Sequence, residues 1–174
     1  LILPSNITVI GKKMFADFNF SGTLVIPKNI TIIEEQAFYN STFESILFEK
    51  GSNLKEIKFQ AFYNCSIEEI SLPNTLEYIG VEAFRNSYIR KIVISSENLK
   101  IDSMAFYYCQ FLREVYINGE FENWMSYEFV DDMSTPMSYA DTIYGLNENN
   151  EYCVVTEIVI QDTITSIGNY QFKK

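Results

Sequence analysis

The sequence predicts a solenoid of stacked repeats built from short β-strands, with room for about one turn of helix in each repeat and with one island that does not repeat. The first supporting observation is a phenylalanine that recurs at nearly constant spacing, and the second is a short alternating apolar segment before each copy. A period of about 20 to 50 residues is the signature of repeat architectures. One repeat buries too little apolar surface to offset the entropy of ordering it, so neighbouring repeats must stack.

The recurring phenylalanines define the length of the repeat. Their steps are 23, 24, 22, 22 and 66 residues, and since 66 is three times 22, the last step contains an insertion of about two repeat lengths. An isoleucine lies five residues before each of them, which leaves room for about one turn of helix. Alanine directly precedes the phenylalanine in four copies and permits close approach of the chain. The six pairs are Ile10 and Phe15, Ile33 and Phe38, Ile57 and Phe62, Ile79 and Phe84, Ile101 and Phe106, and Ile167 and Phe172.

The alternating apolar segments are predicted to be short β-strands, because they are rich in β-branched residues and alternate with a period of two. Pro4, Pro27 and Pro73 directly follow three of these segments, where a strand must stop donating hydrogen bonds to its neighbours. The segments are 1–3, 24–26, 46–48, 70–72, 92–94, 115–117 and 158–160.

The strand pattern L-x-x-I-x-I, the proline after it and the Ala-Phe pair resemble the BspA-type leucine-rich repeat over nearly the whole chain. This resemblance implies a curved, horseshoe-like leucine-rich-repeat solenoid that is mostly β. It implies a parallel sheet of short strands along one side and short helical or 3-10 turns opposite the sheet. It also implies a cell-surface or secreted protein of a microbe living on mucosa, acting in adhesion to host matrix proteins or other cells. The chain departs from the pattern at Met14 and Gln171 in place of alanine and at Gln161 in place of proline. The fourth unit is also one residue short between Leu99 and Ile101.

The predicted domain organisation is leucine-rich repeats over 1–117, a non-repeat island over 118–154, and a resumed, truncated repeat over 155–174. Both ends of the chain cut through a repeat. Because solenoids need capping repeats to cover their terminal apolar faces, we expect the native protein to extend further.

The island is predicted to hold a short helix followed by a β-hairpin. Segments 142–144 and 152–154 flank an asparagine-rich loop and form the hairpin, and 134–136 is a loop. Trp124 and Tyr127 are candidate binding residues, since loops on rigid scaffolds often bind partners. The alternative is a packed insertion that lets the solenoid continue. The apolar face of the helix would consist of Phe121, Trp124, Met125 and Phe129.

Composition narrows the possible functions. A net charge of −10 disfavours nucleic acid and anionic lipid as partners, and no apolar run is long enough for membrane insertion. The sequence contains no histidine, which excludes Ser-His and Cys-His nucleophile pairs and histidine-ligated zinc. Carboxylates are scattered over variable repeat positions. We therefore expect a non-catalytic protein that needs no cofactor and no metal.

The candidate binding surface is the outer face of the predicted sheet. The residue between the two inward positions of each strand points outward, and parallel stacking joins these residues into one apolar stripe. The alternative is that β-branched residues simply suit a sheet. The stripe is expected to contain Ile2, Val25, Leu47, Ser71, Val93, Tyr116 and Val159. The charges expected to flank it are Glu44, Glu68, Glu69, Arg90, Lys91, Arg113, Glu114 and Glu157.

Two further rows follow the phenylalanines. The residues directly after them form a row on the far side of the solenoid, either a binding surface or a cover for the joints between repeats. The residues two positions after them are asparagines, expected to satisfy turn backbone groups or, alternatively, to bind a polar ligand. The first row is Tyr39, Tyr63, Arg85 and Tyr107. The second is Asn40, Asn64 and Asn86.

The cysteines are expected to be free. Cys65 and Cys109 occupy the same repeat position two repeats apart, which places their sulfurs about 10 Å from each other, too far for a disulfide. They should be buried thiols stacked with Ser41 and Ser87. Cys153 has no evident partner.

An acidic group in the island is a candidate calcium site, although its spacing does not match an EF-hand and we expect solvated surface instead. This group is Glu128, Asp131, Asp132 and Asp141. Glycosylation sequons occur at Asn6, Asn19, Asn29, Asn40 and Asn64.

The function expected from these features is a non-catalytic protein-interaction module of a cell-surface or secreted protein, adhering to host or other cell and matrix proteins. The alternatives are an intracellular leucine-rich-repeat scaffold for protein partners, and a solenoid arm of a larger protein whose activity lies elsewhere.

Overall fold

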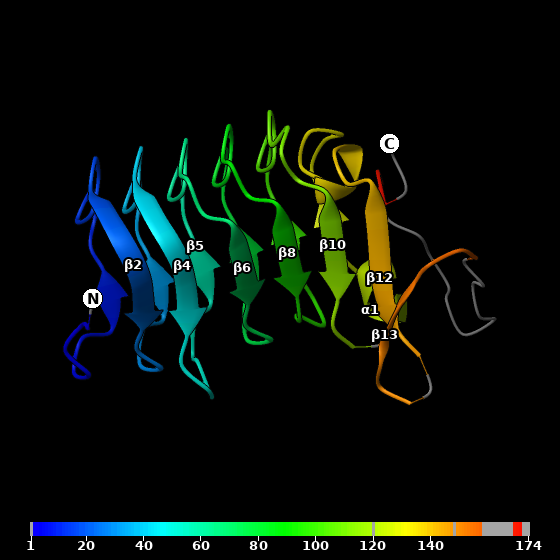
Figure 1. Ribbon diagram of the computed structural model, residues 1–174, viewed down its shortest axis with the longest axis horizontal. Coiled ribbons are helices and arrows are strands. Elements are labelled where there is room, and N and C mark those ends of the chain that lie inside the picture. The colour runs from blue at the N-terminus through cyan, green and yellow to red at the C-terminus, as the bar shows by residue number, and fades with distance from the viewer. Residues whose placement is uncertain (1, 120, 148, 158–168, 172–174) are drawn as a thin grey trace.

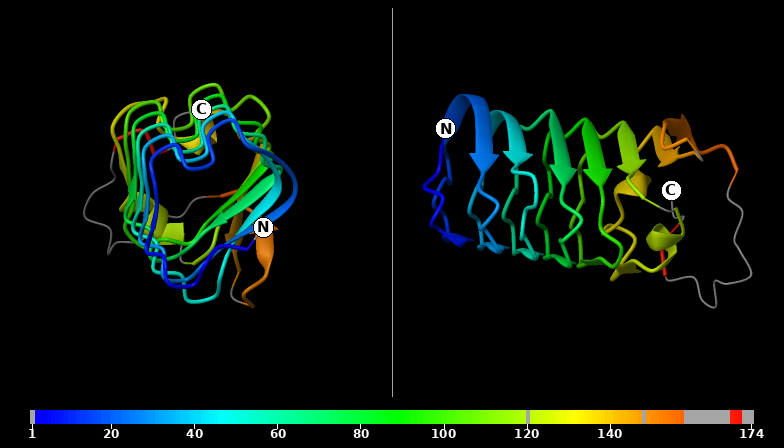
Figure 2. Two further views of the ribbon diagram at one scale, coloured as in Figure 1. Left: turned by 90° about the vertical axis from the view of Figure 1, so that its left-hand side faces the viewer. Right: turned by 90° about the horizontal axis from the view of Figure 1, so that it is seen from below.

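The structure is a computed structural model that describes residues 2–119, 121–147, 149–157 and 169–171. The chain winds into a solenoid of stacked turns whose strands pair in parallel, and the N-terminus lies at one end of the stack (Figure 1). Seen along the stack, successive turns follow nearly the same outline (Figure 2). The predicted leucine-rich-repeat-type solenoid is therefore confirmed.

Seven strands form the larger sheet, which we call the broad sheet. Its strand order is β13-β12-β10-β8-β6-β4-β2, and every neighbouring pair is parallel except β12 with β13. The predicted strands in the described repeats all lie in it, apart from the first segment, which contributes a bridge between Ile2 and Val25. The strands are β2 (Asn19–Ile26), β4 (Thr42–Phe48), β6 (Glu69–Leu72), β8 (Lys91–Ile94), β10 (Glu114–Ile117), β12 (Thr142–Leu146) and β13 (Tyr152–Val154).

A second, narrow sheet lies on the other side of the core, and the sequence did not indicate it. It contains six two-residue strands, and the repeated isoleucine is the second residue of the first five. These isoleucines are fully buried, so they face the core as predicted but stand in strands rather than at the start of a helical turn. The strands are β1 (Val9–Ile10), β3 (Ile32–Ile33), β5 (Glu56–Ile57), β7 (Tyr78–Ile79), β9 (Lys100–Ile101) and β11 (Glu128–Phe129).

The segments between isoleucine and phenylalanine form hydrogen-bonded turns instead of the expected helical turns. In the repeat around Phe62, Gln60 has a φ of 52° and Asn64 a φ of 55°. A right-handed helix cannot continue through left-handed residues. The backbone groups bond to the next turn of the stack instead, as when the N–H of Phe62 donates to Ala83 at 2.7 Å.

The repeated phenylalanines stack in single file through the core. Phe62 lies 4.9 Å from Phe38 and 5.0 Å from Phe84 between ring centroids, with planes within 10° of parallel. The column continues to Phe15 at one end and to Phe106 at the other. The four rings from Phe38 to Phe106 have no exposed surface, so the column is the centre of the hydrophobic core.

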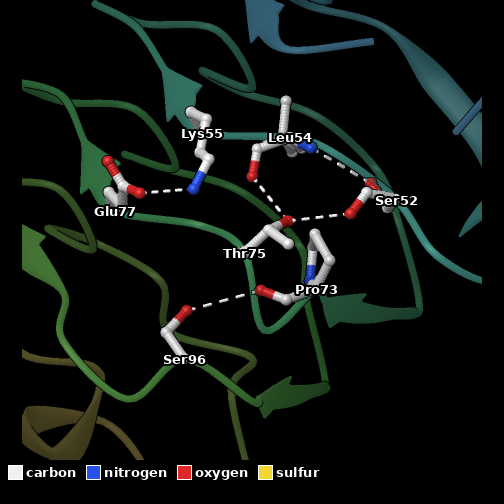
Figure 3. A network of polar contacts seen from close by, with 7 residues as sticks. All are labelled: Ser52, Leu54, Lys55, Pro73, Thr75, Glu77 and Ser96. Carbon is white, nitrogen blue, oxygen red and sulfur yellow. Dashed lines mark hydrogen bonds and ion pairs between the residues drawn. The ribbon is translucent and has the colours of Figure 1, made fainter. Parts of the chain in front are cut away.

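The corners between the two sheets are held by polar contacts from one turn to the next (Figure 3). The hydroxyl of Thr75 donates to the carbonyl of Ser52 at 3.0 Å or to that of Leu54 at 2.8 Å. The Ser96 hydroxyl reaches the carbonyl of Pro73 at 3.4 Å in the same way. These contacts satisfy backbone acceptors where the strands end.

The island continues both sheets. Strand β11 pairs with β9, and β12 pairs in parallel with β10 before forming the predicted hairpin with β13. The helix α1 (Phe121–Met125) is shorter than expected because Phe129 belongs to β11, where it is needed to fill the core. The predicted loop at 134–136 leads into a 3-10 turn, η1 (Pro136–Ser138), capped by Thr135. The expected strand 158–160 and the residues Ile167 and Phe172 lie outside the described residues.

Candidate binding surface

The outward residues of the broad sheet form one continuous row, which we call the sheet-face stripe. Adjacent members are paired by the strand register, as for Val25 with Leu47, Ser71 with Val93, and Val93 with Tyr116. Leu47 is 53% exposed. The stripe consists of Ile2, Val25, Leu47, Ser71, Val93, Tyr116 and Tyr144.

Tyr144 follows Tyr116 in the stripe, a place that the sequence did not assign to it. The predicted member Val159 lies outside the described residues, and the neighbour of Tyr116 comes from the island. The alternation of 142–144 matches that of 114–116, and this was the signal that could have identified Tyr144. The island therefore contributes to the surface through its strand.

Three tyrosines form an aromatic cluster at this end of the stripe. The ring of Tyr116 stacks on Tyr144 at 4.3 Å and meets Tyr152 edge-on at 4.8 Å. The Lys91 ammonium lies 4.9 Å from the Tyr116 ring centre. Burial and a hydrogen bond to Glu114 raise the pKa of Tyr116 to about 12, so the Tyr116 hydroxyl is uncharged at neutral pH. Tyrosine gives a large, rigid contact surface and is enriched among the residues that dominate protein interfaces.

Ion pairs run along the stripe from strand to strand. Arg90 pairs with Glu68 and Lys91 with Glu69, each at 3.4 Å. A shallow hollow of about 250 Å³ opens between β4 and β6, where Glu44, Glu68 and Glu69 surround Leu47. Glu44 makes no hydrogen bond or ion pair within the described part of the chain. This end of the surface is therefore acidic.

The far-side row has the geometry of a cover over the joints between repeats. Tyr39 stacks on Tyr63 at 5.1 Å, and the Arg85 guanidinium lies 5.9 Å from the Tyr63 ring and 5.2 Å from the Tyr107 ring. Hydrogen bonding to Glu82 raises the pKa of Arg85. Each side chain of the row contacts the next one along the stack, which favours the joint-covering alternative.

Amide side chains form ladders beside this row. Asn86 donates to Asn64 and Asn64 to Asn40, each at 2.7 Å, so the predicted asparagine stack bonds mainly to itself. The sequence did not indicate the parallel ladder in which Gln36 donates to Gln60 at 2.7 Å. All of these residues have positive φ, which asparagine tolerates better than most residues.

The cysteines are free, as predicted. Cys65 and Cys109 are buried, and each thiol donates to the carbonyl of the phenylalanine one turn earlier, Cys65 to Phe38 at 2.6 Å and Cys109 to Phe84 at 3.0 Å. Ser41 and Ser87 do the same at the alternate levels. The sulfurs and hydroxyls therefore form one internal ladder.

The assignment of Trp124 and Tyr127 to a binding surface is wrong, because their side chains are 0% and 1% exposed. The Trp124 ring packs 5.2 Å from Phe129, and its indole N–H donates to the backbone carbonyl of Gln171 at 3.0 Å. The Gln171 amide donates back to the Tyr127 carbonyl at 2.6 Å. Large aromatics are buried here because this turn lacks the Ala-Phe pair and needs other side chains to fill its core.

The acidic residues of the island do not form a metal centre. Among the described residues, no group of three potential ligands lies close enough together to hold an ion. Asp131 is instead a turn anchor, since it accepts hydrogen bonds from the hydroxyls of Ser103 at 2.5 Å and Ser134 at 2.7 Å, and from the N–H of Met133 at 3.0 Å. Asp141 pairs with Arg113 at 3.4 Å.

Asp131 should make the stability of this turn depend on acidic pH. Burial alone would raise the pKa of Asp131, but the hydrogen bonds from Ser103, Ser134, Met104 and Met133 outweigh it and lower the pKa. The stabilisation is then complete above the unfolded value of about 3.9 and is lost as the pH falls through the lower folded value. We expect Asp131→Asn to lower the free energy of unfolding by about 1–3 kcal/mol at pH 7.

Urea denaturation at pH 7 and at about pH 3 measures this effect, because the difference between the wild type and Asp131→Asn should shrink on acidification. Glu151→Gln, which changes an exposed carboxylate elsewhere in the island, is the control. An equal difference at both pH values would contradict the anchor role.

The chain matches the model of a protein family described as "BspA type Leucine rich repeat region". The match has six copies and covers residues 1–54, 37–149 and 147–174. No curated protein gives a significant sequence match. Similar solved structures include the pneumococcal vaccine antigen PcpA, with 21% identity and a TM-score of 0.46 over 83% of this chain and 37% of that one. Another is a leucine-rich repeat protein from Bacteroides ovatus, with 14% identity and a TM-score of 0.27 over 66% of this chain and 48% of that one.

The chain thus spans less than half the length of either of these proteins. Within the residues that the structure describes, no helix is long and apolar enough to cross a membrane.

Proposed function

Because the chain belongs to the BspA-type leucine-rich repeat family, we propose that it is a non-catalytic interaction module of a cell-surface or secreted protein, acting in adhesion to host matrix proteins or other cells. Its architecture is that of a leucine-rich-repeat protein-interaction module. The adhesive role is what the family resemblance implies. The observation that supports binding is the sheet-face stripe.

The stripe has three properties that suit a protein partner. It is continuous, because the strand register places its members side by side across the broad sheet. It is rigid, because its members from Val25 to Tyr144 stand on hydrogen-bonded strands backed by a buried core. It combines exposed apolar side chains such as Leu47 with the tyrosine cluster, and contiguous exposed apolar surface marks interaction sites.

We predict that Leu47→Glu combined with Val93→Glu abolishes binding, with a loss of affinity of about 100-fold or more, because two carboxylates would be buried against the partner without counter-charges. Both side chains point outward, so the melting temperature should stay within a few degrees of the wild type. The measurement is binding of the purified chain to a panel of immobilised extracellular-matrix proteins and to host cells.

The matched control is Val9→Glu with Val130→Glu. Val9 and Val130 are also exposed apolar residues, at 39% and 47%, but they lie on or beside the narrow sheet. This control should bind like the wild type. Unchanged binding by the stripe variant, or equal loss in the control, would exclude the stripe as the binding surface.

Placement at the cell surface is tested separately. An antibody against the chain should label intact cells of the source organism. Labelling that requires permeabilised cells would favour the intracellular scaffold. In that case the stripe would still be the expected contact surface.

A further inference from the structure

One row of charges across β4, β6, β8 and β10 falls into two blocks of opposite sign. Glu44 lies in β4, level with Glu68, which directly precedes β6. Arg90 and Arg113 directly precede β8 and β10, the next two strands of the sheet (Figure 1). The backbone N–H of Arg113 donates to the carbonyl of Arg90 at 2.9 Å, so these two residues are direct neighbours. Glu69 and Lys91, which are paired in register, repeat the change of sign one residue further on.

Stacking alone does not account for this order. Ion pairs along the stack would be served best by alternating signs, whereas here like charges stand side by side on strands about 4.8 Å apart, which is destabilising. Opposite charges are in contact between β6 and β8, where Arg90 pairs with Glu68 and Lys91 with Glu69, and between β10 and β12, where Arg113 pairs with Asp141. Lys91 is also in register with Glu114 of β10. The like-charged neighbours are Glu44 with Glu68 and Arg90 with Arg113. The block arrangement becomes favourable when an opposing surface brings the inverse pattern.

We propose that this opposing surface is a second copy of the chain, so that the module forms a face-to-face dimer through the broad sheet. The two-fold axis would run parallel to the strands, between β6 and β8. Such a rotation preserves strand direction and exchanges β6 with β8, β4 with β10, and β2 with β12. A two-fold interface requires one patch that complements itself. The inference names a partner for the surface in the proposed function and rests on it.

The exchange brings three pairs of opposite charges together, and it leaves Glu114 and Asp141 facing uncharged residues of the second copy. Glu68 meets Arg90 of the second copy, Glu69 meets its Lys91, and Glu44 meets its Arg113. Each of these pairs occurs twice because of the symmetry. Glu44, which has no partner among the described residues, thereby gains one.

The remaining rows are compatible with the same axis. In the stripe, Leu47 meets Tyr116 of the second copy and Val25 meets its Tyr144, so the tyrosine cluster covers the aliphatic end. Ser71 meets Val93 near the axis. Two residues before Leu47 and Tyr116, Ser45 meets Glu114 of the second copy. None of these exchanges places like charges against each other.

The size of the surface predicts a weak dimer. Six parallel strands spaced about 4.8 Å, each presenting about four residues, give a patch of roughly 30 Å by 15 Å. This lies at the low end of specific interfaces, so we expect a dissociation constant in the micromolar range. Because much of the contact is ionic and rim-exposed, raising the salt concentration should weaken it.

Sedimentation velocity over about 1–500 µM at low salt is the test, and the wild type should shift from monomer to dimer across this range. Glu68→Lys with Glu69→Lys should weaken dimerisation by about 30-fold or more, because the introduced lysines face Arg90 and Lys91 of the second copy. Adding Arg90→Glu and Lys91→Glu to the same chain should restore it, since the swapped pattern is again self-complementary at the original net charge.

The matched control is Glu35→Lys with Glu77→Lys. These glutamates also pair with lysines one turn away, Lys12 and Lys55, but they lie on the narrow-sheet side. The control makes the same charge change and breaks two comparable ion pairs, and it should dimerise like the wild type. Far-UV circular dichroism verifies that each variant is folded.

The inference would be overturned if the wild type stays monomeric, or if the quadruple variant with exchanged charges fails to restore the dimer. Its failure is distinguishable from that of the proposed function. If the chain is monomeric while Leu47→Glu with Val93→Glu still abolishes adhesion, only the dimer is refuted. If the dimer behaves as expected while adhesion does not respond to that pair, only the adhesive role of the stripe is refuted.

Discussion

Replacing Phe62 with alanine should lower the free energy of unfolding by about 3–5 kcal/mol, which is a large fraction of the stability of an ordinary domain. The ring has no exposed surface and contacts the rings of Phe38 and Phe84 on both sides. Its removal leaves a cavity in the middle of the column. The rigid turns on either side, bonded to their neighbours by backbone hydrogen bonds, cannot collapse into it.

Urea denaturation followed by circular dichroism measures this loss, and Phe111→Ala is the control. Phe111 is 50% exposed and stacks only on the exposed Tyr88 at 5.0 Å, so its removal should cost less than about 1 kcal/mol. Similar losses in the two variants would mean that the column is not the centre of stability. Trp124 is the only tryptophan and lies toward the C-terminal end of the stack, several turns from Phe62. Its fluorescence therefore shows whether distant turns of the solenoid unfold together.

Cys65 and Cys109 should be nearly inert to thiol reagents in the folded protein. Burial raises the pKa of both thiols to about 12 from the ordinary 9.0. The reactive thiolate is then about 1,000-fold scarcer at pH 8, and exclusion of the reagent from the core slows the reaction further. Cys153 is exposed and should react at once.

A thiol titration tests this directly, because we expect one reactive thiol in the native protein and three in denaturant without reductant. Rapid reaction of a second thiol in the folded state would contradict the burial.

The internal ladder of thiols and hydroxyls can be tested with two variants of Cys65. Cys65→Ser should be nearly neutral because serine occupies the equivalent places at Ser41 and Ser87, whereas Cys65→Ala leaves the Phe38 carbonyl without its donor and should cost about 1–3 kcal/mol.

The fold was largely predictable because its periodicity is written along the chain. One residue per turn, such as Phe62, marks the repeat length, and the two-residue alternation around Leu47 marks the strand and its outward face. The buried state of Cys65 followed from the same arithmetic. Each of these inferences depends only on equivalent residues lying above one another, which any stacked repeat ensures.

The island was less predictable because it has no period. Trp124, Tyr127 and Phe129 suggested a helix face and a binding knob, but their rings fill the core of one turn of the solenoid. Tyr144 joined the stripe only because β12 pairs with β10. Spacing alone could not assign these residues, since their environment is set by the preceding turn.

By itself, the sequence determined the repeat length, the column of phenylalanines, the inward and outward faces of the strands and the absence of histidine chemistry. These follow from local periodicity and composition. Only the tertiary structure decided the narrow sheet, the left-handed turns at Gln60 and Asn64, the amide ladders and the two charge blocks on the broad sheet. Such features arise between turns of the chain some two dozen residues apart, where hydrogen bonding and electrostatics depend on the register with which one turn settles on the next.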